Sequence, residues 1–192
     1  MLSRRHIRLK VMQSLYSYFS AKEDNMAAYE RAMLKHIEEV VELNLVIISL
    51  LIELVKYADN FYEDSKKKHF PSAEDLNPNR RFVDNHLISI IRKDKALMDR
   101  ISKISGIWLK NDHDIIRKLF KELFESELYT RYIASEKVGV DVDQRFIVNA
   151  LNEIILNNNL VSEECKSNRY IIPFYGICKS IININCGRLN SF

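Results

Sequence analysis

The sequence predicts an all-α protein, and three observations support that prediction. Only 4 Gly and 3 Pro occur among 192 residues, so few positions interrupt long segments. Apolar residues recur at three- and four-residue steps through much of the chain, which is the spacing of one helix face. The composition is 47% hydrophobic and 29% charged, which is typical of a globular chain and not of a disordered one.

A first helix is expected over residues 4–19. Its apolar residues recur at helical steps and form one face, made of Ile7, Val11, Met12, Leu15, Tyr18 and Phe19. Arg4 and Arg8 are one turn apart on a different face, with Arg5 nearby. We therefore expect the arginines to face outward, while the helix is held to its neighbours through Ile7, Val11 and Leu15.

A second, long helix is expected to follow. Asp24 or Asn25 is a suitable cap, and the helix begins near Met26 and continues to about Lys68, unbroken or with a break near residues 43–44. Its most apolar run, residues 43–55, is too short to span a bilayer and contains a glutamate. This run predicts a buried core helix in a soluble protein.

A connector containing Pro71 and Pro78 separates the long helix from shorter ones. Helices are expected over residues 81–92 and 95–105. Two more are expected after caps at Asp112 or Asp114 and at Asp141 or Asp143. Their predicted core residues are Ile115, Ile116, Leu119, Phe120, Leu123 and Phe124 in the first, and Phe146, Ile147, Leu151, Ile154 and Ile155 in the second.

Three parts of the chain differ in character. We expect residues 1–68 to form an N-terminal helical part with the Arg-rich helix, and residues 69–165 to form further helices that pack as one domain. Residues 166–192 are a divergent tail, rich in Ile and Asn. All three cysteines lie at or after residue 165 without zinc or redox spacing, and their odd number favours a reducing cytoplasm.

Motifs for enzymatic chemistry are not recognisable. The four glycines are scattered and form no phosphate-binding loop, and no hydrolase triad occurs at a known spacing. The NDHD run at residues 111–114 and the DVD run at residues 141–143 come nearest to metal-ligand clusters, but both fit helix caps far better. We therefore expect no enzymatic activity, no cofactor and no metal.

The start of the chain has an uneven charge. Residues 1–22 hold five basic side chains and no acid, and three interpretations fit this pattern. It is typical of a mitochondrial presequence, of a solvated helix face, and of an RNA-binding surface on which arginines hold phosphates. Tyr16 lies off the centre of the apolar stripe, where a ring can stack on an unpaired base. Trp108 is expected to pack in the core.

The order of residues in RRHIRLKVMQSLY resembles the opening helix of the NusB family of transcription antitermination factors. The matching positions are Arg4, Arg5, Arg8, Gln13, Leu15 and Tyr16. Further segments are similar to the elongated NusB-like proteins of Bacteroidetes-type bacteria, namely LNLVIISLLIELVKYAD, KKKHFPSAEDLNPNRRFVDN and KLFKELFESELYTRYIASE. The resemblance covers about residues 1–165.

The resemblance implies an all-helical bacterial protein of the cytoplasm, which disfavours the presequence. Its implied function is binding of boxA-type RNA in ribosomal RNA transcripts, together with the ribosomal protein NusE, within the RNA polymerase elongation complex. By this resemblance, Arg4, Arg5 and Arg8 contact phosphates or bases, Gln13 reads a base edge, and Tyr16 stacks or forms a hydrogen bond near the RNA.

The chain departs from the family near its end. Family members usually contain a second bundle with a segment like Phe-Val-Asn-Gly-Val-Leu-Asp, of which residues 146–154 are only a loose echo. We therefore expect the second family bundle to be missing or replaced, which puts binding to NusE in doubt and leaves apolar surface that favours a homodimer. The rival hypothesis is a helical protein-interaction module without RNA binding of its own.

Overall fold

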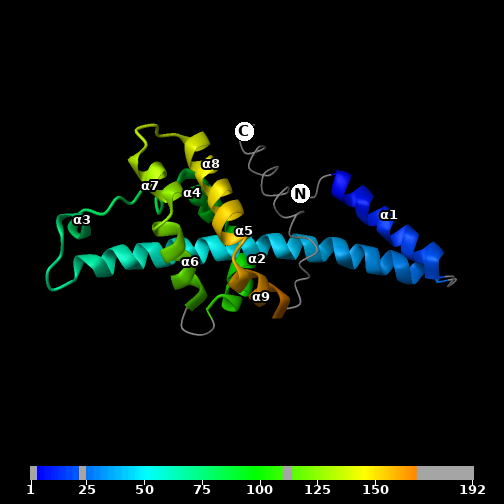
Figure 1. The fold of residues 1–192 in the computed structure, drawn as a ribbon. Coiled ribbons are helices and arrows are strands. Elements are labelled where there is room, and N and C mark those ends of the chain that lie inside the picture. The colour runs from blue at the N-terminus through cyan, green and yellow to red at the C-terminus, as the bar shows by residue number, and fades with distance from the viewer. Residues whose placement is uncertain (1–3, 22–24, 110–113, 168–192) are drawn as a thin grey trace.

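The computed structural model describes residues 4–21, 25–109 and 114–167, and every regular element in these ranges is helical (Figure 1). The all-α prediction is therefore confirmed. The long helix α2 (Met26–Lys66) runs through the whole molecule. Helix α1 (Arg4–Ala21) lies antiparallel along the first part of α2, and the later helices gather around its second part.

Helix α2 has 41 residues and continues without the break that was considered near residues 43–44. At a rise of 1.5 Å per residue, its length is about 60 Å. No glycine or proline lies between its ends, so nothing in the sequence interrupts the backbone ladder. Asn25 caps it as predicted, because its side-chain oxygen accepts a hydrogen bond from the Ala28 amide at 3.2 Å.

The remaining helices are short and surround the second part of α2. They are α3 (Ala73–Leu76), α4 (His86–Lys93), α5 (Lys95–Ile104), the 3-10 turn η1 (Ser105–Ile107), α6 (Asp114–Phe124), α7 (Glu127–Ala134), α8 (Val140–Ala150), the π-helical turn η3 (Leu151–Ile155) and α9 (Asn159–Ser167). Side chains of Ser72, Asn85, Asp94 and Ser126 cap four of them. These caps define the boundaries of the shorter elements.

Two predicted helix starts need correction. The helix predicted over residues 81–92 begins only at His86, because the Asn85 side chain caps it there. Gly139, and neither Asp141 nor Asp143, occupies the cap position of α8. Asp114 is the first residue of α6, whereas Asp112 lies outside the described residues.

The hydrophobic core lies between α2 and the helices that follow it, and it extends from Leu43 to Cys165. The core therefore contains residues from both predicted parts of the chain, residues 1–68 and residues 69–165. Trp108 is fully buried, as predicted, and its indole N–H donates to the Val46 carbonyl at 3.2 Å and to the Ser49 hydroxyl at 2.9 Å. These two bonds attach η1 to the middle of α2.

The predicted core faces of the later helices are largely confirmed. In α6, four of the six predicted residues are buried, while Ile115 is half-buried and Phe124 is exposed. All five residues predicted for the segment after Gly139 are buried. Within the described ranges, no helix combines the length and the apolar character needed to cross a membrane. The tail predicted from its composition falls mainly on residues 168–192, which lie outside the described part.

Candidate nucleic-acid interface

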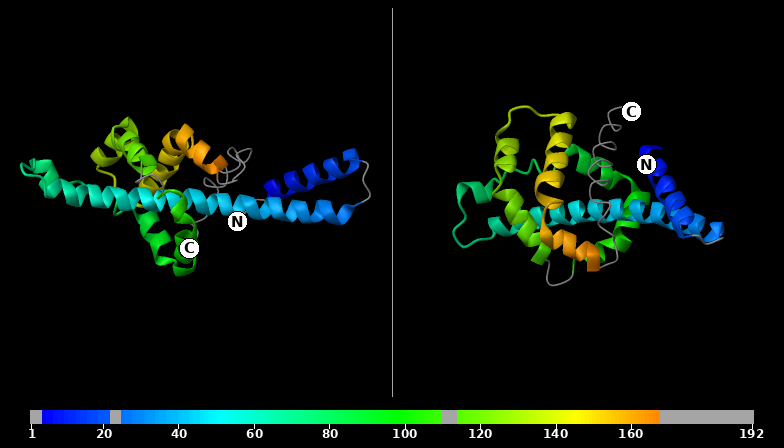
Figure 2. Two further views of the ribbon diagram at one scale, coloured as in Figure 1. Left: turned by 90° about the horizontal axis from the view of Figure 1, so that it is seen from below. Right: turned by 45° about the vertical axis from the view of Figure 1, so that its right-hand side comes forward.

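The candidate site lies on a helical hairpin that projects from the body of the protein. We call this hairpin the arm, and it comprises α1 and residues 26–42 of α2. The left view of Figure 2 shows it extending well past the helices that enclose the core. No described side chain before Leu43 is buried, so this part of the protein has no core of its own.

A narrow strip of α1 contacts α2. Val11, Ser14 and Tyr18 are half-buried there, and the Tyr18 ring packs edge-on against Tyr29, with 5.5 Å between the ring centroids. The expected anchoring through Ile7, Val11 and Leu15 is right only for Val11, because the other two side chains are exposed. A helix that packs against one neighbour is covered only on the side facing that neighbour, so the rest of the apolar stripe of α1 stays in solvent.

The predicted RNA-binding residues lie on the exposed part of α1. Arg4, Arg8 and Gln13 are exposed, and 75% of the Tyr16 surface is accessible. The side chain of Arg5 lies outside the described part of the structure. Since α1 contains no acid, and no described carboxylate pairs with Arg4 or Arg8, these two guanidinium groups can accept an external anion.

The five predicted residues do not share one narrow stripe. With 3.6 residues per turn, Arg4 and Arg8 lie on one side of α1 and Tyr16 is about 80° further round than Arg8. Gln13 is on the opposite side from Arg4 by the same geometry. A single strand can therefore touch Arg4, Arg8 and Tyr16 together, whereas Gln13 would need the strand to wrap across the helix.

Lys10 differs from the arginines of the same helix. It is half-buried, and this burial lowers the pKa of its ammonium group, while the charge of Glu39 on α2 acts in the opposite direction. Lys10 thus faces α2 and belongs to the contact between the two helices. The part of α1 that presents basic groups outward is its first two turns.

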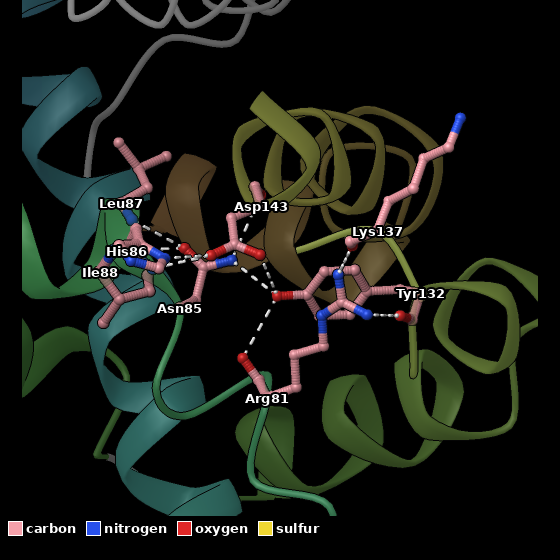
Figure 3. A network of polar contacts seen from close by, with 8 residues as sticks. All are labelled: Arg81, Asn85, His86, Leu87, Ile88, Tyr132, Lys137 and Asp143. Carbon is pink, nitrogen blue, oxygen red and sulfur yellow. Dashed lines mark hydrogen bonds and ion pairs between the residues drawn. The ribbon is translucent and has the colours of Figure 1, made fainter. Parts of the chain in front are cut away.

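A second polar cluster lies inside the body and connects α4, α7 and α8 (Figure 3). The Asp143 side chain accepts hydrogen bonds from the Tyr132 hydroxyl at 2.8 Å and from the His86 amide at 3.0 Å, and it lies 2.8 Å from the His86 Nδ1. Asn85 donates to the Tyr132 hydroxyl and to the Asp143 carbonyl, both at 3.2 Å. Asp143 is only 3% exposed, and both oxygens of its carboxylate accept hydrogen bonds.

Arg81 extends this network to the end of α7. Its guanidinium group lies over the Tyr132 ring, 4.5 Å from the centroid, and donates to the Tyr132 carbonyl at 2.8 Å and the Ser135 carbonyl at 2.5 Å. It also donates to the Lys137 carbonyl. A cation that binds the last carbonyls of a helix is favoured by the helix dipole.

We interpret this network as structural. The imidazole of His86 resembles half of a catalytic dyad, but in the described part of the chain its other nitrogen has no partner that could serve as a nucleophile. In the same part, no three His, Cys, Asp or Glu side chains gather as they would around a metal. Sequence reasoning placed Asp143 at a helix start but missed its partners, because they lie 57 and 11 residues away.

The network predicts an acid-dependent loss of stability. Burial alone would raise the pKa of Asp143, but the hydrogen bonds from His86 and Tyr132 outweigh it and lower this pKa below its ordinary value of 3.8. The stabilisation is therefore complete above the unfolded-state pKa and is lost as the pH falls through the lower folded-state pKa.

We expect the difference in unfolding free energy between the parent and Asp143→Asn to be constant down to about pH 5 and to shrink below about pH 4. Urea titrations over a pH series measure it, and a difference that grew in acid would contradict the assignment.

Comparisons of the chain with protein-family models, with curated proteins and with solved structures found no match. The likeness to NusB proteins is therefore supported by the residues of α1 and the following segments alone.

Proposed function

We propose that the protein is an RNA-binding transcription antitermination factor that acts on boxA-type RNA in the cytoplasm, together with the ribosomal protein NusE. The observation that supports this proposal best is the outward surface of α1, where Arg4, Arg8 and Tyr16 are exposed on an acid-free helix. The match of this helix to the NusB opening motif supplies the RNA class and the partner.

The proposed mechanism is electrostatic capture followed by stacking. Arg4 and Arg8 hold two phosphates of a single strand and release the counterions that accompanied them. Tyr16 then receives an unpaired base on its ring, since aromatic stacking on single-stranded RNA is tolerant of sequence. Sequence preference comes from Arg5 and Gln13, by the family resemblance, and from NusE as the second RNA-contacting partner.

The test is an RNA titration with the double variant Arg4→Ala/Arg8→Ala. We expect each lost arginine to weaken binding of a boxA-type strand about tenfold, because a charge-assisted hydrogen bond contributes about 1.5–3 kcal/mol. The plot of log affinity against log salt should also become shallower by about 0.7 for each lost phosphate contact. Fluorescence anisotropy at two salt concentrations measures both quantities.

The matched control is Arg92→Ala/Arg100→Ala, which removes two exposed arginines from α4 and α5, outside the arm. This variant should bind like the parent. Equal affinity and equal salt slope for the α1 variant and the parent would exclude the α1 surface as an RNA site. A parent chain that prefers a scrambled strand would exclude the boxA assignment.

A protein-interaction module without RNA binding is the second candidate. The observation that favours it is the exposed apolar surface of the arm, which includes Leu15 and Phe19. A nuclease-treated chain that still retains a protein partner, and that shows no RNA affinity in the titration above, would favour this second function over the first.

A further inference from the structure

Two neighbouring aromatic rings of α1 are exposed near the tip of the arm. Tyr16 is 75% exposed and Phe19 is 73% exposed. They are three residues apart, so they are neighbours on the helix surface, with about 5–6 Å between their Cβ atoms. Figure 1 shows the end of α1 that carries them at the tip of the arm, away from the body. A single exposed ring is ordinary in a soluble protein, but two adjacent rings on an acid-free helix require an explanation.

Phe19 lies in line with the arginines of α1. It is eleven positions after Arg8, so with 3.6 residues per turn the two side chains are only about 20° apart around the helix axis and about 16 Å apart along it. Met12 lies between them and is exposed, and Tyr16 is about 60° to one side of Phe19. A strand whose phosphate is held by Arg8 therefore reaches Phe19 by running straight along α1.

Contacts of Tyr18 hold the Phe19 ring in place. The two rings meet edge to face, with 5.4 Å between their centroids. Tyr18 is half-buried, and its ring packs in the same way against Tyr29 of α2. Phe19 is thus connected through Tyr18 to the contact between the two helices of the arm. A ring that is already held in position loses less conformational freedom when a base stacks on it, which favours binding.

The charge near the two rings favours a nucleic acid over a protein as the ligand. Helix α1 has four basic residues and no acid, and no described carboxylate pairs with Arg8. Aromatic rings next to cationic groups are the combination that binds unpaired bases together with their phosphates. In double-stranded RNA the bases are stacked within the duplex and cannot reach such rings.

We propose that Phe19 is a second stacking site of the RNA surface, so that Tyr16 and Phe19 each receive one unpaired base of the strand that Arg8 holds. This inference rests on the proposed function, and it adds a residue that the matching positions of the NusB motif do not include. The ligand is a strand with two neighbouring unpaired bases at the tip of the arm. Because every base has a flat face, the two rings add affinity more than sequence preference.

The test measures binding of a labelled boxA-type single strand to the full chain by fluorescence anisotropy. Phe19→Ala should weaken binding about tenfold, because stacking of one base contributes on that scale. Phe19→Leu should weaken it nearly as much, since leucine retains apolar surface but has no flat ring, whereas Phe19→Tyr should bind like the parent. All three should leave the plot of log affinity against log salt unchanged, because stacking releases no counterion. This last result separates the ring from the arginines.

Strands with a single abasic nucleotide identify the base at each ring. In the parent, removal of the base that stacks on Phe19 should weaken binding about tenfold. The same removal should have little further effect in Phe19→Ala, because the ring that the base would contact is already absent. In Tyr16→Ala, the abasic position without further effect should be the adjacent nucleotide.

The matched control is Phe70→Ala, which removes an exposed phenylalanine ring outside the arm and should bind RNA like the parent. Far-UV circular dichroism should show unchanged helix content for every variant, because the replaced side chains are exposed.

Three outcomes would overturn the proposal. If Arg4→Ala/Arg8→Ala weakens RNA binding and Phe19→Ala does not, the RNA function stands and only the stacking site at Phe19 is wrong. If the parent binds no RNA, the proposed function and this inference are both wrong. If Phe19→Ala keeps its RNA affinity but loses a protein partner that the nuclease-treated parent retains, the ring belongs to a protein contact.

Discussion

Replacing Asp143 by alanine is expected to lower the free energy of unfolding by about 3 kcal/mol, a large part of the 5–15 kcal/mol that holds a typical domain together. The carboxylate is the acceptor for the His86 amide at the start of α4 and for the Tyr132 hydroxyl. Without it the amide loses its acceptor, and the hydroxyl retains the Arg81 carbonyl as an acceptor at 3.2 Å and the Asn85 amide as a donor. Asp143 is only 3% exposed, and breaking a buried hydrogen-bond network is a recognised cause of large destabilisation.

Urea unfolding followed by circular dichroism measures this loss. The matched control is Asp99→Ala, which removes an exposed carboxylate from α5 and should change the unfolding free energy by less than about 0.5 kcal/mol. Equal stability of the Asp143 variant and the control would show that the network does not hold α4 to α8.

Trp108→Ala is expected to destabilise the protein by about 4 kcal/mol, in the range measured for truncation of large buried aromatic residues. Trp108 is fully buried between η1 and α2. Its removal leaves a cavity, and the Val46 carbonyl and the Ser49 hydroxyl lose the indole donor. The Ser49 hydroxyl keeps its own bond to the Val46 carbonyl at 2.7 Å, so that pair remains connected.

A second variant separates the contribution of the buried volume of Trp108 from that of its hydrogen bonds, and a third variant is the control. Trp108→Phe retains most of the volume and loses only the donor, so its cost should be about 1–2 kcal/mol. Phe70→Ala removes an aromatic ring that is 87% exposed and should be nearly neutral. If Trp108→Ala were as mild as Phe70→Ala, the site would have to collapse around the lost ring, and the predicted cost of the cavity would be wrong. Unfolding of all three variants is followed by circular dichroism. Trp108 is the single Trp of the chain, so its replacement removes the tryptophan fluorescence that would otherwise report unfolding.

The sequence predicted the helical class and the long second helix because these depend on local features. Scarce glycine and proline, a single Asn25 cap and a regular apolar spacing are all visible within one helix length. The core face of α6 was predictable for the same reason, since its period is local. Phe124 is the exception, because exposure at a helix end depends on which neighbours reach it.

The tertiary contacts were not predictable in this way. The apolar stripe of α1 indicated a buried face, but only its neighbour α2 decides how much is covered, and Leu15 and Phe19 remain exposed. The partners of Asp143 come from two other helices, and nothing in a run such as DVD identifies them. The candidate RNA residues were found from a motif, and the structure adds that Gln13 lies on the far side of α1 from Arg4.

The continuity of α2 has a consequence for hydrogen exchange. Its second half is enclosed by the core, whereas its first half is supported mainly by α1. Backbone amides of one uninterrupted helix therefore belong to two cooperative units of different opening free energy, with fast exchange in the arm and slow exchange beyond Leu43. A ligand or second chain that binds the arm would protect the first unit and leave the second unchanged, so binding at the arm is energetically separable from the stability of the body.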